Sequence, residues 1–100
     1  MNTITLTEKN FDREVNQSTL PVLVSYEDGN FPNAAASVDS VSSRLDGVMK
    51  CCKINVGTDP TLATKNKVRS VPTIQLFKDG KVTDTIVGSM KTEQLMKILQ

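Results

Sequence analysis

The sequence predicts an α/β fold in which a central mixed β-sheet is flanked by helices on both faces, and three observations support this. Strand-like and helix-like segments alternate through the first two-thirds of the chain. Pro21 to Tyr26 is a nearly continuous β-prone apolar run, which is typical of a parallel strand covered on both faces. Asp79-Gly80, between two β-prone segments, indicates an antiparallel hairpin.

The first half of the chain predicts two strands and two helices. Thr3 to Leu6 alternates polar and apolar residues, as a strand does, and the Thr7 hydroxyl can cap a helix over residues 8–15. After the central strand come several turn-forming residues, and Asn33 is expected to cap a second helix. The apolar positions of that helix recur every three or four residues until Gly47 ends it.

The second half predicts another strand and a short helix before the hairpin. Residues 48–56 are β-prone, and Asp59-Pro60 combines a capping side chain with a proline suited to the first helical turn. The hairpin strands are expected over residues 73–77 and 81–87. Parallel strands need crossover helices and the hairpin does not, so the sheet is expected to be mixed.

A final helix is expected from Thr92, with Leu95, Ile98 and Leu99 facing the core. The complete order is β-α-β-α-β-α-β-β-α. A chain of 100 residues forms one hydrophobic core, so residues 1–100 are expected to fold as a single domain.

Composition argues against several classes of function. The net charge is +1, with 12 basic and 11 acidic residues, and aromatic residues are only 4%, so nucleic acid is not an expected partner. No leader pattern begins the chain and no apolar stretch approaches the ~20 residues of a membrane span, so a cytoplasmic monomer is expected. The chain has no histidine, which disfavours zinc, and no cofactor or metal is expected.

Seven sequence blocks, in their order and spacing, resemble the thioredoxin family over nearly the whole chain. They are Asn10-Phe11-Asp12, Pro21-Val22-Leu23-Val24, Lys53-Ile54-Asn55-Val56, Val68-Arg69-Ser70-Val71-Pro72-Thr73, Leu76-Phe77-Lys78-Asp79-Gly80, Val87-Gly88 and Glu93-Gln94-Leu95. The resemblance implies a thioredoxin-like fold. It also implies disulfide exchange by two cysteines at the start of the second helix, on which the family's activity depends.

The segment that should carry those cysteines contains none. It is Glu27-Asp28-Gly29-Asn30-Phe31-Pro32-Asn33-Ala34. The family's buried acid falls on Ser25, whose hydroxyl cannot take up a proton as a carboxylate does at neutral pH. Nucleophile, resolving thiol and proton acceptor are therefore all missing from this degenerate active-site loop.

The two cysteines of the chain, Cys51 and Cys52, are adjacent within an expected strand. Successive side chains of a strand point to opposite faces. Neighbouring α-carbons lie about 3.8 Å apart, below the usual 4.4 to 6.8 Å of a disulfide, so two free thiols are expected. Packing in the core is the favoured interpretation, and redox chemistry at Cys51 or Cys52 is the alternative.

Val71-Pro72 matches the family's cis-proline, and the resemblance implies that the residue before it pairs with an extended substrate peptide. The alternative is that this turn only closes the fold. A protein or peptide client is the expected partner. The implied surface comprises Ser70, Val71, Pro72, Thr73, Gly88 and Phe31.

Two hypotheses of function follow. The first is a redox-inactive thioredoxin-fold module that binds extended polypeptide near Val71-Pro72 without catalysis. The second is a thioredoxin-family disulfide oxidoreductase, or a protein of cell redox homeostasis, that uses Cys51 or Cys52 in an atypical one-thiol scheme. From the missing loop cysteines we expect the first.

Overall fold

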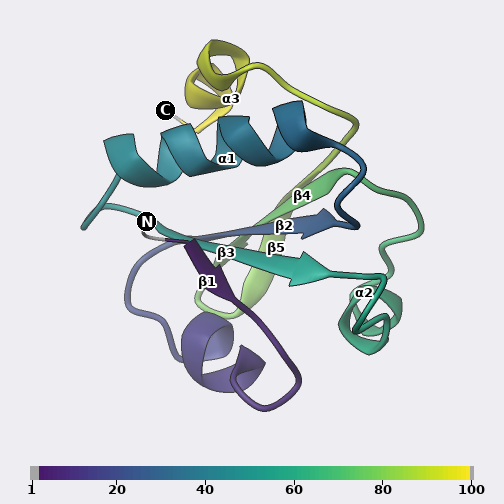
Figure 1. Ribbon diagram of the computed structural model, residues 1–100. Helices are drawn as coiled ribbons and strands as arrows, with labels where there is room; N and C mark the ends of the chain where they lie inside the picture. Colours follow the sequence, from purple (N-terminus) through teal and green to yellow (C-terminus); the bar gives the residue numbers. More distant parts are fainter. Residues whose placement is uncertain (1–2, 100) are drawn as a thin grey trace.

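The computed structural model describes residues 3–99 and shows a five-stranded sheet between two layers of helices (Figure 1). The strands are β1 (Thr3–Thr5), β2 (Val22–Glu27), β3 (Lys50–Asn55), β4 (Thr73–Lys78) and β5 (Lys81–Val87). The helical segments are η1 (Asp12–Asn16), α1 (Pro32–Arg44), α2 (Thr61–Lys65) and α3 (Thr92–Ile98). This is the thioredoxin-like α/β fold that the sequence predicts.

The spatial order of the sheet is β1-β3-β2-β4-β5. Strands β1, β3 and β2 are parallel, whereas β4 is antiparallel to both β2 and β5. The predicted apolar run forms β2, which is the middle strand of the sheet. The first five residues of β2 are buried, because helices cover both faces of the sheet. The predicted hairpin turns at Asp79-Gly80, where both residues have positive φ.

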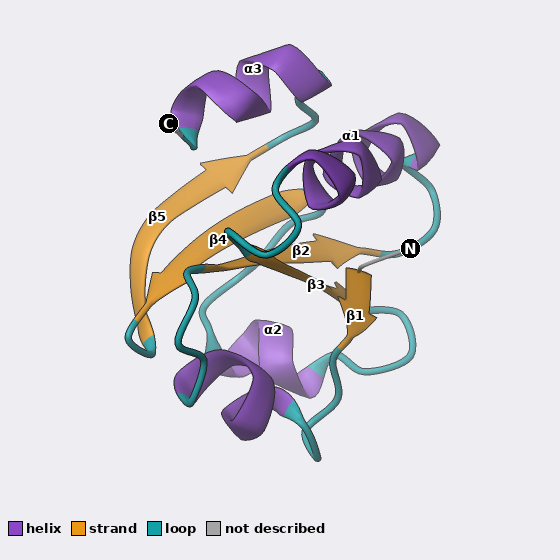
Figure 2. Cartoon of the chain, turned by 90° about the vertical axis from the view of Figure 1, so that its left-hand side faces the viewer, coloured by secondary structure: helices purple, strands orange, loops and turns teal. Residues whose placement is uncertain are grey.

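Each face of the sheet carries its own apolar cluster. Figure 2 shows α1 and α3 on one side of the sheet, with α2 and the N-terminal helical segment on the other. The α1 face holds Leu23, Val38, Val41, Cys51, Ile74, Leu76 and Leu95. The η1 face holds Leu6, Val15, Val22, Val24, Tyr26, Cys52, Ile54, Leu62, Ala63 and Phe77.

The beginnings of α1 and α2 differ from the predicted ones. Asn33 does not cap α1, because Pro32, which has no amide hydrogen to satisfy, already begins the helix. Neither helix has a side-chain cap hydrogen bond. Pro60 occupies the capping position of α2, so Asp59 is not its cap either.

The predictions for the first and last helices were also wrong in part. Residues 8–10 form turns instead of the predicted helix, and the helical part is the short π-helical turn η1. The Asn10 side chain stabilises these turns, because it accepts from the Thr7 amide and donates to the Thr5 carbonyl. In α3, Leu95 is buried but Ile98 is 43% exposed. The prediction for Ile98 was wrong because it lies three residues from Leu95, at the margin of the inward stripe.

No helix within residues 3–99 has both the length and the apolar character needed to cross a bilayer.

Candidate functional site

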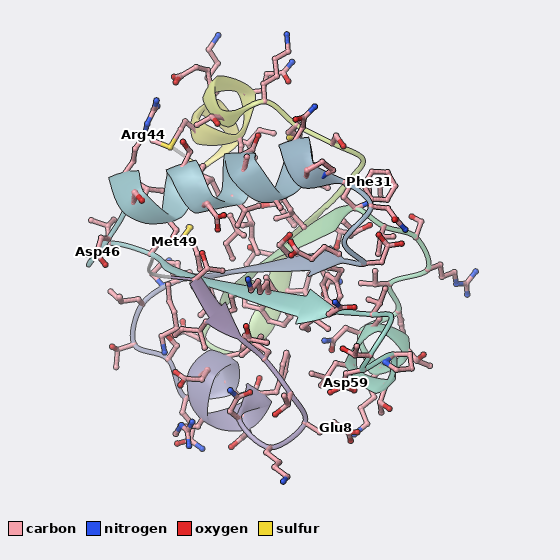
Figure 3. The ribbon with its side chains drawn as sticks, in the orientation of Figure 1. Glu8, Phe31, Arg44, Asp46, Met49 and Asp59 are labelled. Carbon is pink, nitrogen blue, oxygen red and sulfur yellow. The ribbon has the colours of Figure 1, made fainter. Side chains whose placement is uncertain are left out.

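The residues of the expected binding surface meet at one end of the sheet, which we call the rim: residues 27–31, 70–73 and Gly88. Tyr26, at the end of β2, pairs with Thr73 at the start of β4. The Gly88 amide donates to the Pro72 carbonyl at 2.9 Å, and the Val71-Pro72 peptide bond is cis. Phe31 lies at the start of α1 with its ring directed away from the sheet (Figure 3).

The loop between β2 and α1 is held by its own polar groups. The Asn30 amide donates to Asp28 Oδ1 at 3.0 Å, and Gly29 turns the chain with φ of +88°. Buried Ser25 donates its hydroxyl to Glu27 Oε2 at 3.4 Å. This loop can position peptide groups and carboxylates, but it supplies no sulfur nucleophile.

A pocket of about 280 Å³ opens beside the rim, between the end of β3, helix α2 and residues 68–71. Its apolar wall is formed by Val56, Ala63, Val68 and Val71. The pocket therefore offers apolar side chains next to the Val71 backbone, at the edge where an extended chain was expected to pair.

A buried polar network supports the segment that leads to the rim. Tyr26 Oη donates to Gln75 Oε1 at 2.6 Å and accepts from Asn66 Nδ2 at 2.9 Å. Gln75 Nε2 in turn donates to the Asn66 carbonyl at 3.2 Å. Burial raises the pKa of Tyr26 to about 12, so the phenol remains a neutral donor. The network fixes the end of α2 to the centre of the sheet.

Cys51 and Cys52 are free thiols on opposite faces of β3, as predicted. Cys51 is 1% exposed and lies in the α1-face cluster, whereas Cys52 is 0% exposed and lies in the η1-face cluster. Because the two thiols are separated by the sheet, they cannot act together on one substrate disulfide.

Both thiols are protonated at neutral pH. Burial raises the pKa of Cys51 to about 11, although a hydrogen bond with Ser42 opposes this rise. Burial raises the pKa of Cys52 to about 12, opposed by the Lys50 charge. Since the thiolate is the nucleophile, either cysteine reacts only when local opening lets water reach it.

The structure separates the cysteines from the rim. Cys51 pairs with Leu23 near the beginning of β2, whereas the rim begins at Tyr26 and Thr73. Cys51 and Thr73 are separated by three residues along the strands and by two strands across the sheet, which amounts to roughly 14 Å. The cysteines and the rim residues therefore lie at two separate places in the fold.

Sequence reasoning missed the polar groups around Cys51. Ser42 is buried on the inward stripe of α1, and Asp39, on the same helix, accepts a hydrogen bond from Thr3. A serine at an apolar helix position was the available signal for Ser42. Among residues 3–99 no three potential ligands from histidine, cysteine, aspartate and glutamate gather into a metal site.

Comparison with known proteins identifies the relatives of this chain. The family model described as Thioredoxin matches residues 2–100. Thioredoxin 1 of Synechococcus elongatus is 33% identical over 94% of this chain and 91% of its own length, and the thioredoxin of Pseudomonas aeruginosa is 34% identical over 96% and 92%. Rice chloroplastic thioredoxin M5 is 34% identical over 92% of the chain, which spans about half (55%) of that protein.

These relatives correct the first hypothesis of function. The relatives named above are all called thioredoxins, and the match runs through the whole domain, so the redox-inactive, non-catalytic binding module is contradicted. They favour the alternative, a redox protein. The family model over residues 2–100 and the bacterial relatives over more than nine-tenths of the chain show that it belongs to the thioredoxin family.

Proposed function

We propose that this protein is a thioredoxin-family redox protein that exchanges thiols and disulfides through Cys51 or Cys52, one thiol at a time. The observation that carries the proposal is the family match over residues 2–100 in a chain whose only two cysteines are this pair. The placement of the two thiols on opposite faces of β3 favours a one-thiol scheme over a dithiol scheme.

The exchange begins when the cysteine thiolate attacks one sulfur of a client disulfide. A mixed disulfide forms, and the other client sulfur leaves as a thiolate that takes up a proton. A low-molecular-weight thiol then attacks the cysteine sulfur and releases the second client thiol. A further molecule of that thiol regenerates the cysteine, so two small thiols become one small disulfide for each client disulfide reduced.

Burial sets the speed of this exchange. With raised thiol pKa values, the reactive species is the thiolate of a locally opened state, which is a small fraction of the molecules at neutral pH. We therefore expect turnover well below that of a protein with an exposed dithiol.

The proposed client is a protein or peptide that docks at the rim on Ser70, Val71, Gly88 and Phe31, whereas Pro72 and Thr73 of the expected surface are buried. The half-buried Val71 edge and its apolar pocket suit an extended segment that pairs through its main chain. A client cysteine four or five extended residues from that segment spans the roughly 14 Å to the start of β3. The proposed location is the cytoplasm, where thiols are kept reduced.

The test is reduction of a protein disulfide with glutathione as the terminal reductant. Wild type is expected to accelerate the reaction at least several-fold over glutathione alone, and the double variant Cys51→Ser/Cys52→Ser is expected to lose this acceleration. Val71→Pro removes a main-chain donor at the rim, so it should raise KM for the protein disulfide without changing the rate with a small disulfide.

Absence of acceleration by wild type, or full acceleration by the double cysteine variant, would refute the proposal. Circular dichroism of each variant checks that the fold is retained. An unchanged KM for Val71→Pro would remove the rim from the proposal while leaving the exchange reaction.

A further inference from the structure

Cys51 lies one strand away from an edge of the sheet. The edge strand is β1, which is three residues long, and Thr3 is the direct neighbour of Cys51 in the parallel pairing. Paired residues place their side chains on the same face, so Thr3 lies on the α1 face beside Cys51. On its other side Cys51 neighbours Leu23, which is fully buried. Across the sheet, the shortest way from Cys51 to solvent therefore runs past Thr3.

A single side-chain hydrogen bond closes this path. Thr3 Oγ1 donates to Asp39 Oδ1 at 3.1 Å, which joins β1 to the helix that covers Cys51. Within residues 3–99 it is the one side-chain hydrogen bond between β1 and α1. Thr3 and Ile4 are only partly buried and Thr5 is exposed, so β1 contributes little buried surface and opens at low cost.

The two thiols have different surroundings on the two faces. Around Cys51 the polar groups are Thr3, Asp39 and Ser42, and Ser42 is buried on the helix that covers the thiol. Water that enters beside β1 thus finds polar partners, and the Ser42 hydroxyl can donate to the thiolate. Cys52 neighbours Ile4 and Val24 and belongs to the cluster that contains Leu6 and Val15.

We propose that Cys51 is the reacting thiol and that β1 is a gate over it, latched by the Thr3–Asp39 hydrogen bond. The biological role of the gate rests on the proposed function, but its effect on the accessibility of the Cys51 thiol can be measured without that function. Asp39 acts as the latch acceptor and not as a base, since its negative charge disfavours the Cys51 thiolate.

The experiment measures the labelling rates of single-thiol variants with 5,5′-dithiobis(2-nitrobenzoate), in which each reacting thiol releases one thionitrobenzoate. Cys52→Ser retains Cys51, and Cys51→Ser retains Cys52. In the native proteins Cys51 is expected to react at least tenfold faster than Cys52. Adding Thr3→Val should accelerate Cys51 roughly fivefold, as expected for loss of one net hydrogen bond, and change Cys52 less than twofold.

Thr5→Val is the matched control, because Thr5 lies on the same face of β1 but is exposed and makes no side-chain bond to α1. It should leave both rates unchanged. Faster labelling of Cys52, or equal acceleration of both thiols by Thr3→Val, would overturn the gate, since a general loss of stability exposes both. If a serine variant fails to fold, Cys51→Ala and Cys52→Ala serve the same comparison.

Thiol labelling does not require catalytic turnover, so the experiments can refute one of the two proposals without refuting the other. The expected labelling pattern without disulfide reduction would refute the proposed function and retain the gate. Disulfide reduction that depends on Cys52 alone would refute the gate and retain the proposed function.

Discussion

Raising the pH from 9 to 10.5 is expected to lower the free energy of unfolding by about 2 to 3 kcal/mol through the two cysteines alone. Their pKa values in the folded protein are about 11 and about 12, against an ordinary 9.0. Above pH 9 the unfolded chain releases thiol protons that the folded protein still holds, so alkali favours unfolding. The stability contributed by the neutral thiols is complete below pH 9 and is lost toward pH 11 to 12.

Urea titrations of wild type and of Cys51→Ala/Cys52→Ala at a series of pH values measure this effect. The double variant starts from a lower stability, because it leaves small cavities, but its stability should fall less steeply above pH 9. Tyr26, whose pKa is about 12, remains in both proteins and contributes equally above pH 10. Parallel curves for the two proteins would show that neither thiol is held neutral by burial.

Tyr26→Phe is expected to lower the free energy of unfolding by about 1 to 3 kcal/mol, although it removes a single oxygen atom. The lost hydroxyl leaves Gln75 Oε1 and Asn66 Nδ2 without their partner. An unsatisfied polar group in the core costs more than the hydrogen bond contributed. For a chain of this size the expected fall in Tm is about 4 to 8 °C per kcal/mol, measured by thermal unfolding.

Coupling between the two buried partners distinguishes this network from simple packing. The double variant Tyr26→Phe/Gln75→Leu should cost less than the sum of the single variants, because Tyr26 Oη and Gln75 Oε1 are removed together and only Asn66 is left without its partners. Thr64→Val, which removes an exposed hydrogen bond to the Pro60 carbonyl, is the control and should change stability by less than about 0.5 kcal/mol. A fully stable Tyr26→Phe protein would contradict the account of the network.

Most of the fold could be predicted from local patterns, because period and turn chemistry are written in neighbouring residues. The apolar run of β2 and the Asp79-Gly80 turn sufficed to predict the sheet centre and the hairpin. Helix beginnings could not be predicted as well, since Pro32 and Asn33 are both suitable and the choice depends on the path of the preceding loop. The π-helical turn at η1 likewise depends on the contacts of Asn10 with residues before it.

The candidate site was only partly predictable. Alternation within a strand was enough to place Cys51 and Cys52 on opposite faces. The surroundings of Cys51 were not visible, because Thr3 reaches it through strand pairing and bonds to Asp39, which lies 36 residues from Thr3 in the sequence. The function was predicted wrongly because the missing loop cysteines were given more weight than the match of the whole domain to the thioredoxin family.

The measurement that tests the central claim most directly is the mass of the native protein after exposure to glutathione disulfide, with the adduct located by fragmentation between residues 51 and 52. The account predicts one glutathione per chain, attached to Cys51 while the protein remains folded and released by reductant. An unmodified native protein, with adducts only after denaturation, would contradict redox exchange by this chain.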